Sequence, residues 1–553
     1  MMMKIMQLWR NLESKTMQTV GMAAFIVSLA GIASRFLGFL RDRLLAAQFG
    51  AGDKLDAYYA AFRLPDLFYS LIVLGAITAA FLPVFTELRS QKKETEAWTL
   101  ASDVLGLFII VLGVFCLLGM IFADLVVSLV APGFSGEKRE LTISLTRIML
   151  LSPIFLSVSA VLSGVLMSFR CFIAYSLSPF FYNVGILFGI LVLVPFLGVH
   201  GLGWGVVIGS ILHMVTQWPA FSTAGWHLRF HPWRSLRNPA LRRVVRLMIP
   251  RSLSMGVNQI GLLVMTGFAS LLVSGSLTAF TLANNIQSFA LGIFGVAFSV
   301  AVFPSLSLSV SEQKEKIFFT LLADTTRRIL FFVLPLSAFM IVFRAQFVRV
   351  ILGSGQFNWE DTIVTFNILA LLSMSLFAQS LIPLFTRGFF ALQDTKTPLF
   401  IACGAEIFHI GLLLALKQSS YFSIEALALV FSFVTIINFS FLYLALKRRL
   451  SYWNDAKILI PTLKIVLAAV LAGLLAQISK YVFALTVSEL DTFFKVLLQL
   501  FFGLSIGGTA YIFLCVWLRV EELHVLRRFI WCRILRQPEA LASSEDHPEK
   551  GEW

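Results

Sequence analysis

Charged residues gather in the first apolar segment of the chain, and their types and spacing suit the binding of an anion. The run S-R-F-L-G-F-L-R-D-R places Arg35 and Asp42 on one stripe of a helix, with Arg41 and Arg43 beside it. Each such charge at the centre of a span costs about 2.5–3.5 kcal/mol, so this helix must face protein, water or ligand. Because guanidinium groups bind phosphate oxygens in a bidentate way, one interpretation is a hydrated cavity for an anion. The other is a structural Arg–Asp pair near the membrane interface.

Two further apolar segments carry polar candidates. Glu406 and His409 are one helical turn apart, where they either bind a coupling proton or cation or bond only to each other. Arg251 stands at the start of another apolar segment and is either a cavity cation or a cytoplasmic anchor. Since neither a nucleotide-binding loop nor a metal-ligand spacing is present, we expect no metal, no cofactor and no ATP hydrolysis. Transport would then be driven by the membrane potential, a monovalent ion or consumption of the substrate.

The composition requires these residues to be positioned by membrane helices. The 553 residues are 58% hydrophobic and 13% charged, whereas soluble proteins are about a quarter charged. A spanning helix takes roughly 20 apolar residues, and the apolar runs predict about fourteen such helices. We therefore expect an all-α, polytopic integral membrane protein, which excludes a soluble enzyme, a secreted disulfide scaffold and a disordered regulator. Basic residues in alternate loops account for the net charge of +14 without nucleic acid and predict that both termini are cytoplasmic.

Turn residues indicate an internal repeat. Offsets of 221, 223 and 219 positions separate Pro83 from Pro304, Phe134 from Phe357 and Pro179 from Pro398. Unless these residues recur by chance, two six-helix lobes are related by a parallel repeat. The predicted order is a cytoplasmic N-terminus (1–20), a six-helix lobe (21–222), a basic cytoplasmic linker (223–245), a second six-helix lobe (246–446), two additional helices (447–520) and a polar cytoplasmic tail (521–553).

Several motifs resemble those of one known family. The run S-R-F-L-G-F-L-R-D and the following F-G-A-G-D-K-L-D-A-Y-Y-A-A-F-R-L-P-D-L are similar to the MurJ (MviN) family of lipid II flippases. Shorter matches are A-P-G-F, A-S-L-L-V-S-G-S, F-P-S-L-S and Q-D-T-K-T-P. The resemblance covers the first twelve predicted spans. It implies a fold of the multidrug/oligosaccharidyl-lipid/polysaccharide exporter superfamily, with a cationic cavity between two lobes and a lipid-tail groove on the last two helices.

The same resemblance implies a function in peptidoglycan biosynthesis and therefore in cell shape. The expected substrate is lipid II, the undecaprenyl-pyrophosphate-linked precursor, which alternating access moves from the cytoplasmic to the periplasmic leaflet of the bacterial inner membrane. Cell-wall synthases are the expected protein partners. Two other functions stay open: export of a polysaccharide-lipid or, with cation coupling, of a drug, and a scaffold for cell-wall synthases that does not transport. A drug exporter is expected to have an acidic or apolar cavity, which the arginines do not favour.

By resemblance, Arg35 and Arg41 match the cavity arginines of the family, Asp42 their acidic neighbour, and Asp56 the aspartate of the following loop motif. The chain departs from the family pattern at two positions.

Many members have arginine where this chain has Tyr69 and Asn285, so two cavity cations are missing. Our hypothesis is that Arg43 and Arg251 replace their charge. Intact lipid II binding after neutral substitution of both would contradict it.

Overall fold

The computed structural model describes residues 20–74, 77–169, 171–218, 238–487 and 492–523, and these are helical without a strand. Long runs of Leu, Phe, Val and Ala favour membrane-spanning helices, because a helix satisfies its backbone hydrogen bonds internally where lipid offers none. In the described ranges, nine helices are long and apolar enough to cross a membrane, or ten with one bent pair. The all-α, multi-span fold is confirmed, and the exact number of fourteen stays a prediction.

The chain divides into two compact units, each built from several stretches of sequence. Unit 1 comprises Met1–Ile286, Ile351–Ile368 and Thr395–Asn438, and unit 2 comprises Gln287–Val350, Leu369–Asp394 and Phe439–Trp553. Unit 1 draws on both halves of the sequence, whereas unit 2 comes entirely from the second half. The boundaries predicted for the two lobes stay predictions.

The helices of unit 1 begin with those that carry the charged motifs. They are α2 (Val20–Phe49), α3 (Asp53–Phe68), η1 (Tyr69–Leu74), η2 (Ile77–Phe81), α4 (Leu82–Ser90), α5 (Glu94–Ile121), α6 (Ala123–Val130), α7 (Gly136–Met149), α8 (Ser152–Ser168), α9 (Phe172–Phe188), η3 (Gly189–Leu193), α10 (Val194–Leu197), α11 (His200–Val215), α14 (Pro239–Ala269) and α21 (Lys396–Lys417). Four of the described helices have residues in both units: α15 (Ser276–Ala290), α18 (Arg344–Leu352), α19 (Trp359–Ser373) and α22 (Ile424–Arg449).

Wide π-helical turns interrupt several spans. η1 and η2 precede Pro83, and η4 (Leu291–Val296) precedes Pro304, the residue 221 positions later. A proline lacks the N–H that would continue the α-helical ladder, and a π turn accommodates an extra residue where that ladder breaks. The interruption therefore recurs at two of the positions that the repeat relates.

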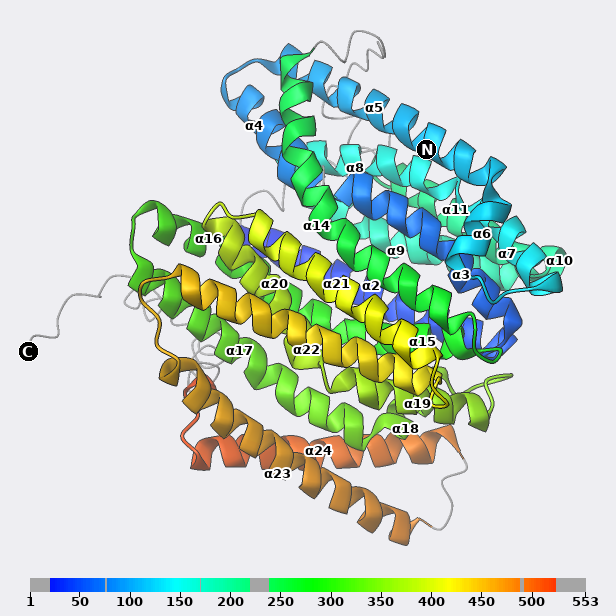
Figure 1. Ribbon diagram of the computed structural model, residues 1–553, viewed down its shortest axis with the longest axis vertical. Coiled ribbons are helices and arrows are strands. Elements are labelled where there is room, and N and C mark those ends of the chain that lie inside the picture. The colour runs from blue at the N-terminus through cyan, green and yellow to red at the C-terminus, as the bar shows by residue number, and fades with distance from the viewer. Residues whose placement is uncertain (1–19, 75–76, 170, 219–237, 488–491, 524–553) are drawn as a thin grey trace, which may run out of the picture. The chain divides into compact units, whose positions relative to one another are not determined.

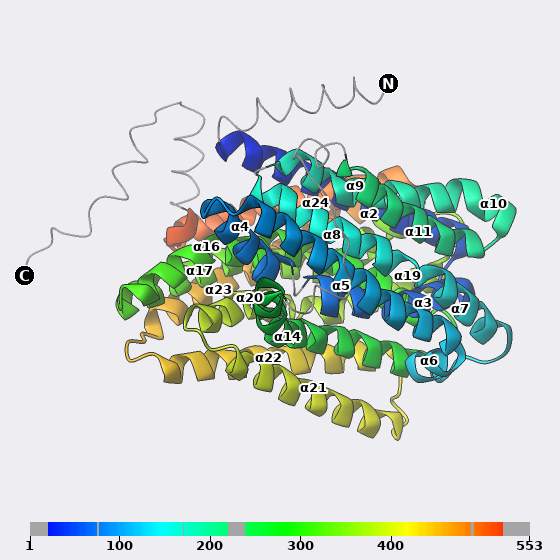
Figure 2. The same ribbon diagram turned by 90° about the horizontal axis from the view of Figure 1, so that it is seen from above.

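In unit 1, α9 packs closely against both α2 and α11 (Figures 1 and 2). α9 and α11 approach through glycines: a Cβ added to Gly185 would lie 2.3 Å from Cα of Gly209, and one added to Gly209 would lie 2.6 Å from the carbonyl oxygen of Tyr182. Small residues let membrane helices approach to backbone contact. Tyr182 of α9 thus lies against α11, while the neighbouring Asn183 donates to Ser34 of α2 at 3.3 Å.

We expect Gly209→Val to lower the free energy of unfolding by about 1–3 kcal/mol, because the new side chain overpacks a backbone contact. Equilibrium unfolding in mixed detergent micelles measures this. The matched control is Gly411→Val, since a Cβ at Gly411 meets no atom within 4 Å. If the two variants had equal free energies of unfolding, the close approach of α9 and α11 would not contribute to stability.

Unit 2 is centred on α17 (Glu315–Val342), onto which the last two helices pack, α23 (Ala456–Thr486) and α24 (Phe493–Trp517). Figure 1 shows α23 crossing α24. Phe343 and the alanines of α23 form the buried interior of this cluster, whereas Phe501 and Leu485 are exposed as expected of a face that meets lipid. The unit also contains η4, α16 (Ala297–Ser311), α18 (Arg344–Leu352) and α20 (Leu376–Ala391).

The loop before α23 is fixed by Asp455. Its carboxylate accepts hydrogen bonds from Lys447 and from the hydroxyl of Tyr443, and these bonds lower the pKa of Asp455 to about 2. The folded-state pKa lies below the ordinary value, so this contribution to stability is present above pH ~4 and disappears as the pH falls toward 2.

Candidate functional site

Arg41 and Asp42 of α2 form the centre of a polar cluster in unit 1. The guanidinium donates from Nε and Nη2 to Oδ1 of Asp42, at 3.0 and 2.9 Å, and from Nη1 to Asn183 of α9 at 3.3 Å. Three of its five N–H donors are thus used inside the protein, which leaves two for a ligand. The side chain of Arg41 is 22% exposed and that of Asp42 only 5%. The carboxylate therefore orients the guanidinium while part of its fork stays accessible.

Asn285 of α15 completes the contacts of Asp42, because its amide donates to Oδ2 at 3.0 Å. Asn285 is the residue that stands where many family members have arginine. Asp42 consequently faces one cation and one neutral amide. The position at which this chain departs from the family pattern therefore lies in the predicted site, next to Asp42.

Arg63 of α3 adds a cation that the sequence analysis did not select. Its Nε donates to Thr266 of α14 at 2.8 Å, and its Nη2 donates to Thr281 of α15 at 3.3 Å. Asp66, one turn further along α3, interacts electrostatically with both Arg63 and Arg41. The hydroxyl of Tyr59 is buried without a hydrogen-bond partner among the described residues. The motif Y-Y-A-A-F-R-L-P-D contains a sequence signal for this arrangement, because its arginine and aspartate lie three positions apart, about one helical turn.

Asp56 is not part of that cluster. Its buried carboxylate, 1% exposed, accepts from Lys138 of α7 and from the backbone N–H of Gly275, both at 2.8 Å, and from the N–H and hydroxyl of Thr278 at 2.8 and 2.7 Å. Both carboxylate oxygens are occupied by these bonds. We therefore expect Asp56 to join α3, α7 and the start of α15 rather than to bind the substrate.

The other predicted cations are less well defined. Arg35 and Arg43 lie on α2 and are half-buried, and each contacts other groups of the protein. Arg251 lies in α14, but its side chain falls outside the described part of the structure. Tyr69 begins η1 and packs against an apolar cluster that includes Phe81. Substrate binding by Arg35, Arg43 and Arg251, and charge replacement by Arg43 and Arg251, stay predictions.

Glu406 and His409 do contact each other on α21, with 3.1 Å between Oε1 and Nδ1. His409 is buried and Glu406 half-buried. Their coupling role stays a prediction at this point. In the described ranges, no group of three His, Cys, Asp or Glu side chains is arranged to hold a metal ion.

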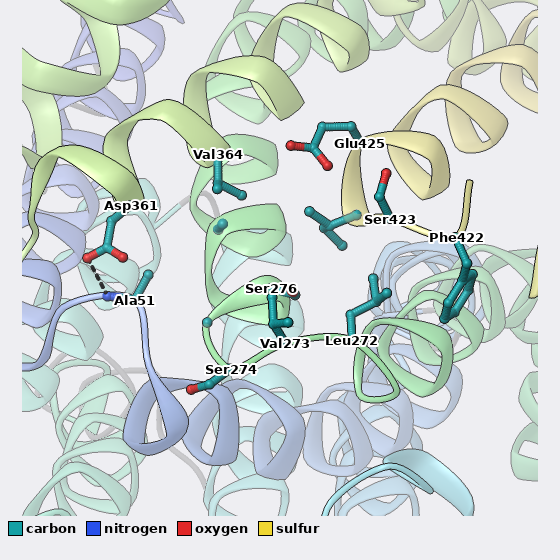
Figure 3. A pocket seen from close by; sticks show the side chains of 13 residues that line it. Ala51, Leu272, Val273, Ser274, Ser276, Asp361, Val364, Phe422, Ser423 and Glu425 are labelled. Atoms are coloured by element: carbon teal, nitrogen blue, oxygen red, sulfur yellow. Dashed lines mark hydrogen bonds between the residues drawn. The ribbon is translucent and has the colours of Figure 1, made fainter. Parts of the chain in front are cut away.

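A separate cavity of 330 Å³ lies in unit 1, near the loop that follows α2. Asp361 of α19 lines it and accepts from the N–H of Ala51 at 3.1 Å, and Glu425 of α22 points into it from the opposite wall (Figure 3). Ser274 and Ser276 lie along its base. None of the residues that line it belongs to the Arg41 cluster.

Fold and site together define a class: a multi-span helical transporter with an internal cationic cluster. Its fold is similar to that of an inward-facing MATE family transporter of the MOP superfamily, with a TM-score of 0.63, 16% identity, and coverage of 75% of this chain and 94% of that one. It is also similar to the inward closed conformation of the lipid II flippase MurJ, with a TM-score of 0.74, 25% identity, and coverage of 90% and 99%.

The sequence comparisons identify the family. The family model described as lipid II flippase MurJ matches residues 45–497, so the chain belongs to the MurJ family. The lipid II flippase MurJ of Burkholderia cenocepacia is 30% identical over 466 residues, which is 82% of this chain and 89% of that protein. The probable lipid II flippase MurJ of Buchnera aphidicola subsp. Acyrthosiphon pisum is 30% identical over 88% of this chain and 95% of that protein.

Proposed function

We propose that the protein is a lipid II flippase of the bacterial inner membrane. The observation that carries this proposal is the accessible part of the Arg41 fork, oriented by Asp42 inside a multi-span MurJ-family fold. Two guanidinium N–H groups suit the oxygens of a pyrophosphate, which is the charged part of an undecaprenyl-pyrophosphate-linked precursor. Burial in a site of low dielectric strengthens this attraction relative to water.

The residues around Arg41 support transport rather than chemistry. Asp42 and Asn183 fix the guanidinium, and Asn285 in turn fixes Asp42. Among the described residues, the cluster contains neither a nucleophile paired with a base nor a metal set. In the proposed cycle, the headgroup enters from the cytoplasmic side, pairs with Arg41 and leaves on the periplasmic side. Both termini are then cytoplasmic, the membrane potential or a monovalent ion supplies the energy, and cell-wall synthases receive the product.

Two alternatives are distinguished by the charge of the cluster. A cation-coupled drug exporter of the same fold is expected to have acidic or apolar groups where this chain has Arg41 and Arg63, so the observed cations favour an anionic substrate. A scaffold that does not transport requires no accessible guanidinium. Binding of purified protein to lipid II separates a scaffold from the transporters.

The proposed function is tested by rescue. A bacterium is depleted of its own lipid II flippase while this chain is expressed at verified membrane levels. We expect growth and normal cell shape to be restored. Failure of a well-inserted chain to rescue, together with failure of the purified chain to bind lipid II, would overturn the proposal.

Asn285→Arg is expected to strengthen lipid II binding by roughly tenfold, because a second cation beside Asp42 releases part of the Arg41 fork to the pyrophosphate. Calorimetric titration of the purified protein measures the change. Asn285→Gln is the matched control, since it keeps a neutral amide. Equal affinity of all three proteins would show that Asn285 does not set the charge that the ligand meets.

A further inference from the structure

The Glu406–His409 pair faces the protein interior from a helix whose other side is apolar. His409 is 2% exposed, whereas Ile407 is 71% exposed, which is the side expected to meet lipid. Nδ1 of His409 lies 3.1 Å from Oε1 of Glu406. The two side chains therefore share one hydrogen bond that is shielded from lipid and largely from water.

The second ring nitrogen of His409 has no partner. Nε2 is buried and makes no hydrogen bond to any described residue. The neighbouring ring of Phe431, with its centroid 6.1 Å away at an interplanar angle of 67°, offers no acceptor. A buried polar atom without a partner is rare and calls for an explanation. An imidazole whose Nδ1–H is donated to a carboxylate has a lone pair on Nε2 that accepts a proton.

Glu406 also contacts α14, the helix that Figure 1 shows beside α21. A Cβ added to Gly261 would lie 2.8 Å from Oε2 of Glu406, so the carboxylate lies directly against α14 and would have to shift for a larger residue. α14 carries two contacts with the candidate site as well. Gln259 donates to Ser70 of η1 at 2.9 Å, and Thr266 accepts from Arg63 at 2.8 Å. α14 therefore contacts both the Glu406–His409 pair and the candidate site around Arg63.

We propose that the Glu406–His409 pair binds one exchangeable proton and couples its passage to transport, an inference that rests on the proposed function. Uptake places the proton from water on Nε2, so the pair changes from a carboxylate with a neutral imidazole to a carboxylate–imidazolium ion pair. Its net charge changes from −1 to 0, and release reverses the step. This change of charge alters the contact between the Glu406 carboxylate and Gly261, and through that contact it affects the position of α14.

A proton fits this site better than a metal cation does. Hard cations take several oxygen ligands, whereas this pair supplies one carboxylate and one ring nitrogen. The groups recorded against the pair from neighbouring helices, Gly261 of α14 and Phe431 of α22, do not titrate.

The other ionisable residues on these elements are more distant along the chain. Cys403 is one turn before Glu406, Lys396 and Lys417 are at the ends of α21, and Glu425 is in the first turn of α22. Arg242, Arg243, Arg246 and Arg251 are in the first half of α14, and Lys447, Arg448 and Arg449 are in the last turn of α22.

Proton binding is tested without lipid II. The protein has seven histidines, so ¹⁵N-histidine labelling in nanodiscs gives few ring signals, and the one absent from H409Q belongs to His409. We expect this signal to change with pH over the range in which the protein stays folded, and the change to differ in E406Q. A signal that stays constant over this range would overturn the proposal. The variant H200Q, which changes an exposed histidine bonded to Ser144, is the matched control and leaves the titration unaltered.

Coupling is tested in proteoliposomes with the membrane potential clamped. Acid on the side to which lipid II moves should raise its accumulation, by up to tenfold per pH unit for one proton. We expect H409Q to lose this response and keep lipid II affinity, and H200Q to behave like wild type. An unchanged response in H409Q, or a response of the wild type only to a sodium gradient, overturns the coupling. If the wild-type protein neither binds nor transports lipid II, the proposed function is overturned instead. The NMR titration then still tests whether the pair binds a proton.

Discussion

Arg41→Ala is expected to abolish rescue of a flippase-depleted strain and to weaken lipid II binding by at least about 100-fold. Two charge-assisted hydrogen bonds to the pyrophosphate are lost, each contributing about 1.5–3 kcal/mol. The substitution also leaves the carboxylate of Asp42, 5% exposed, with only the neutral amide of Asn285. Growth at matched membrane levels and titration of purified protein measure the two effects.

One further variant distinguishes the shape of the Arg41 guanidinium from its charge, and a second is a control. Arg41→Lys retains the charge and loses the planar fork, so we expect intermediate affinity. Arg139→Ala removes an arginine that is paired with Asp124 on another part of unit 1, and we expect full rescue. Full rescue by Arg41→Ala would remove this residue from the mechanism and leave Arg63 as the cation to examine.

Asp56→Asn is expected to lower the free energy of unfolding by about 3–5 kcal/mol, the usual cost of breaking a buried ion pair by removing one partner. The amide replaces one acceptor oxygen with a donor, which opposes the N–H groups of Gly275 and Thr278. Equilibrium unfolding in mixed micelles measures the loss.

Asp53→Asn is the matched control, because Asp53 pairs with the same lysine, Lys138, but its side chain is 60% exposed. We expect a change of about 1 kcal/mol or less for this exposed pair. If the two variants were equally stable, the buried network of Asp56 would not be what joins these segments.

The sequence predicted the position of a side chain well where a wrong position in the membrane would cost much free energy. A charged residue inside a span must face the interior, so Arg41 and Asp42 could be assigned to a polar site from their spacing alone. Glu406 and His409 likewise contact each other as the one-turn spacing allowed. The apolar runs predicted the helical fold for the same reason, since a lipid environment leaves the backbone few alternatives.

Partners that are distant along the chain could not be predicted. Arg63 is separated by 203 positions from Thr266, and Asp42 by 243 from Asn285, so neither contact leaves a local pattern. For Asp56, the unpredictable distant contacts argue against a predicted role instead of adding a new residue to the site. Its motif indicated a site residue, but only the fold reveals that donors from two other segments already occupy its oxygens.

The network around Asp56 also has a consequence for biosynthesis. Thr278 follows Asp56 by 222 positions, and at about 5–20 residues per second the ribosome needs on the order of tens of seconds to supply it. Lys138 follows by only 82 positions and is therefore the first partner to emerge. We therefore expect the carboxylate of Asp56 to pair first with Lys138 and to gain the amide and hydroxyl donors of Gly275 and Thr278 later.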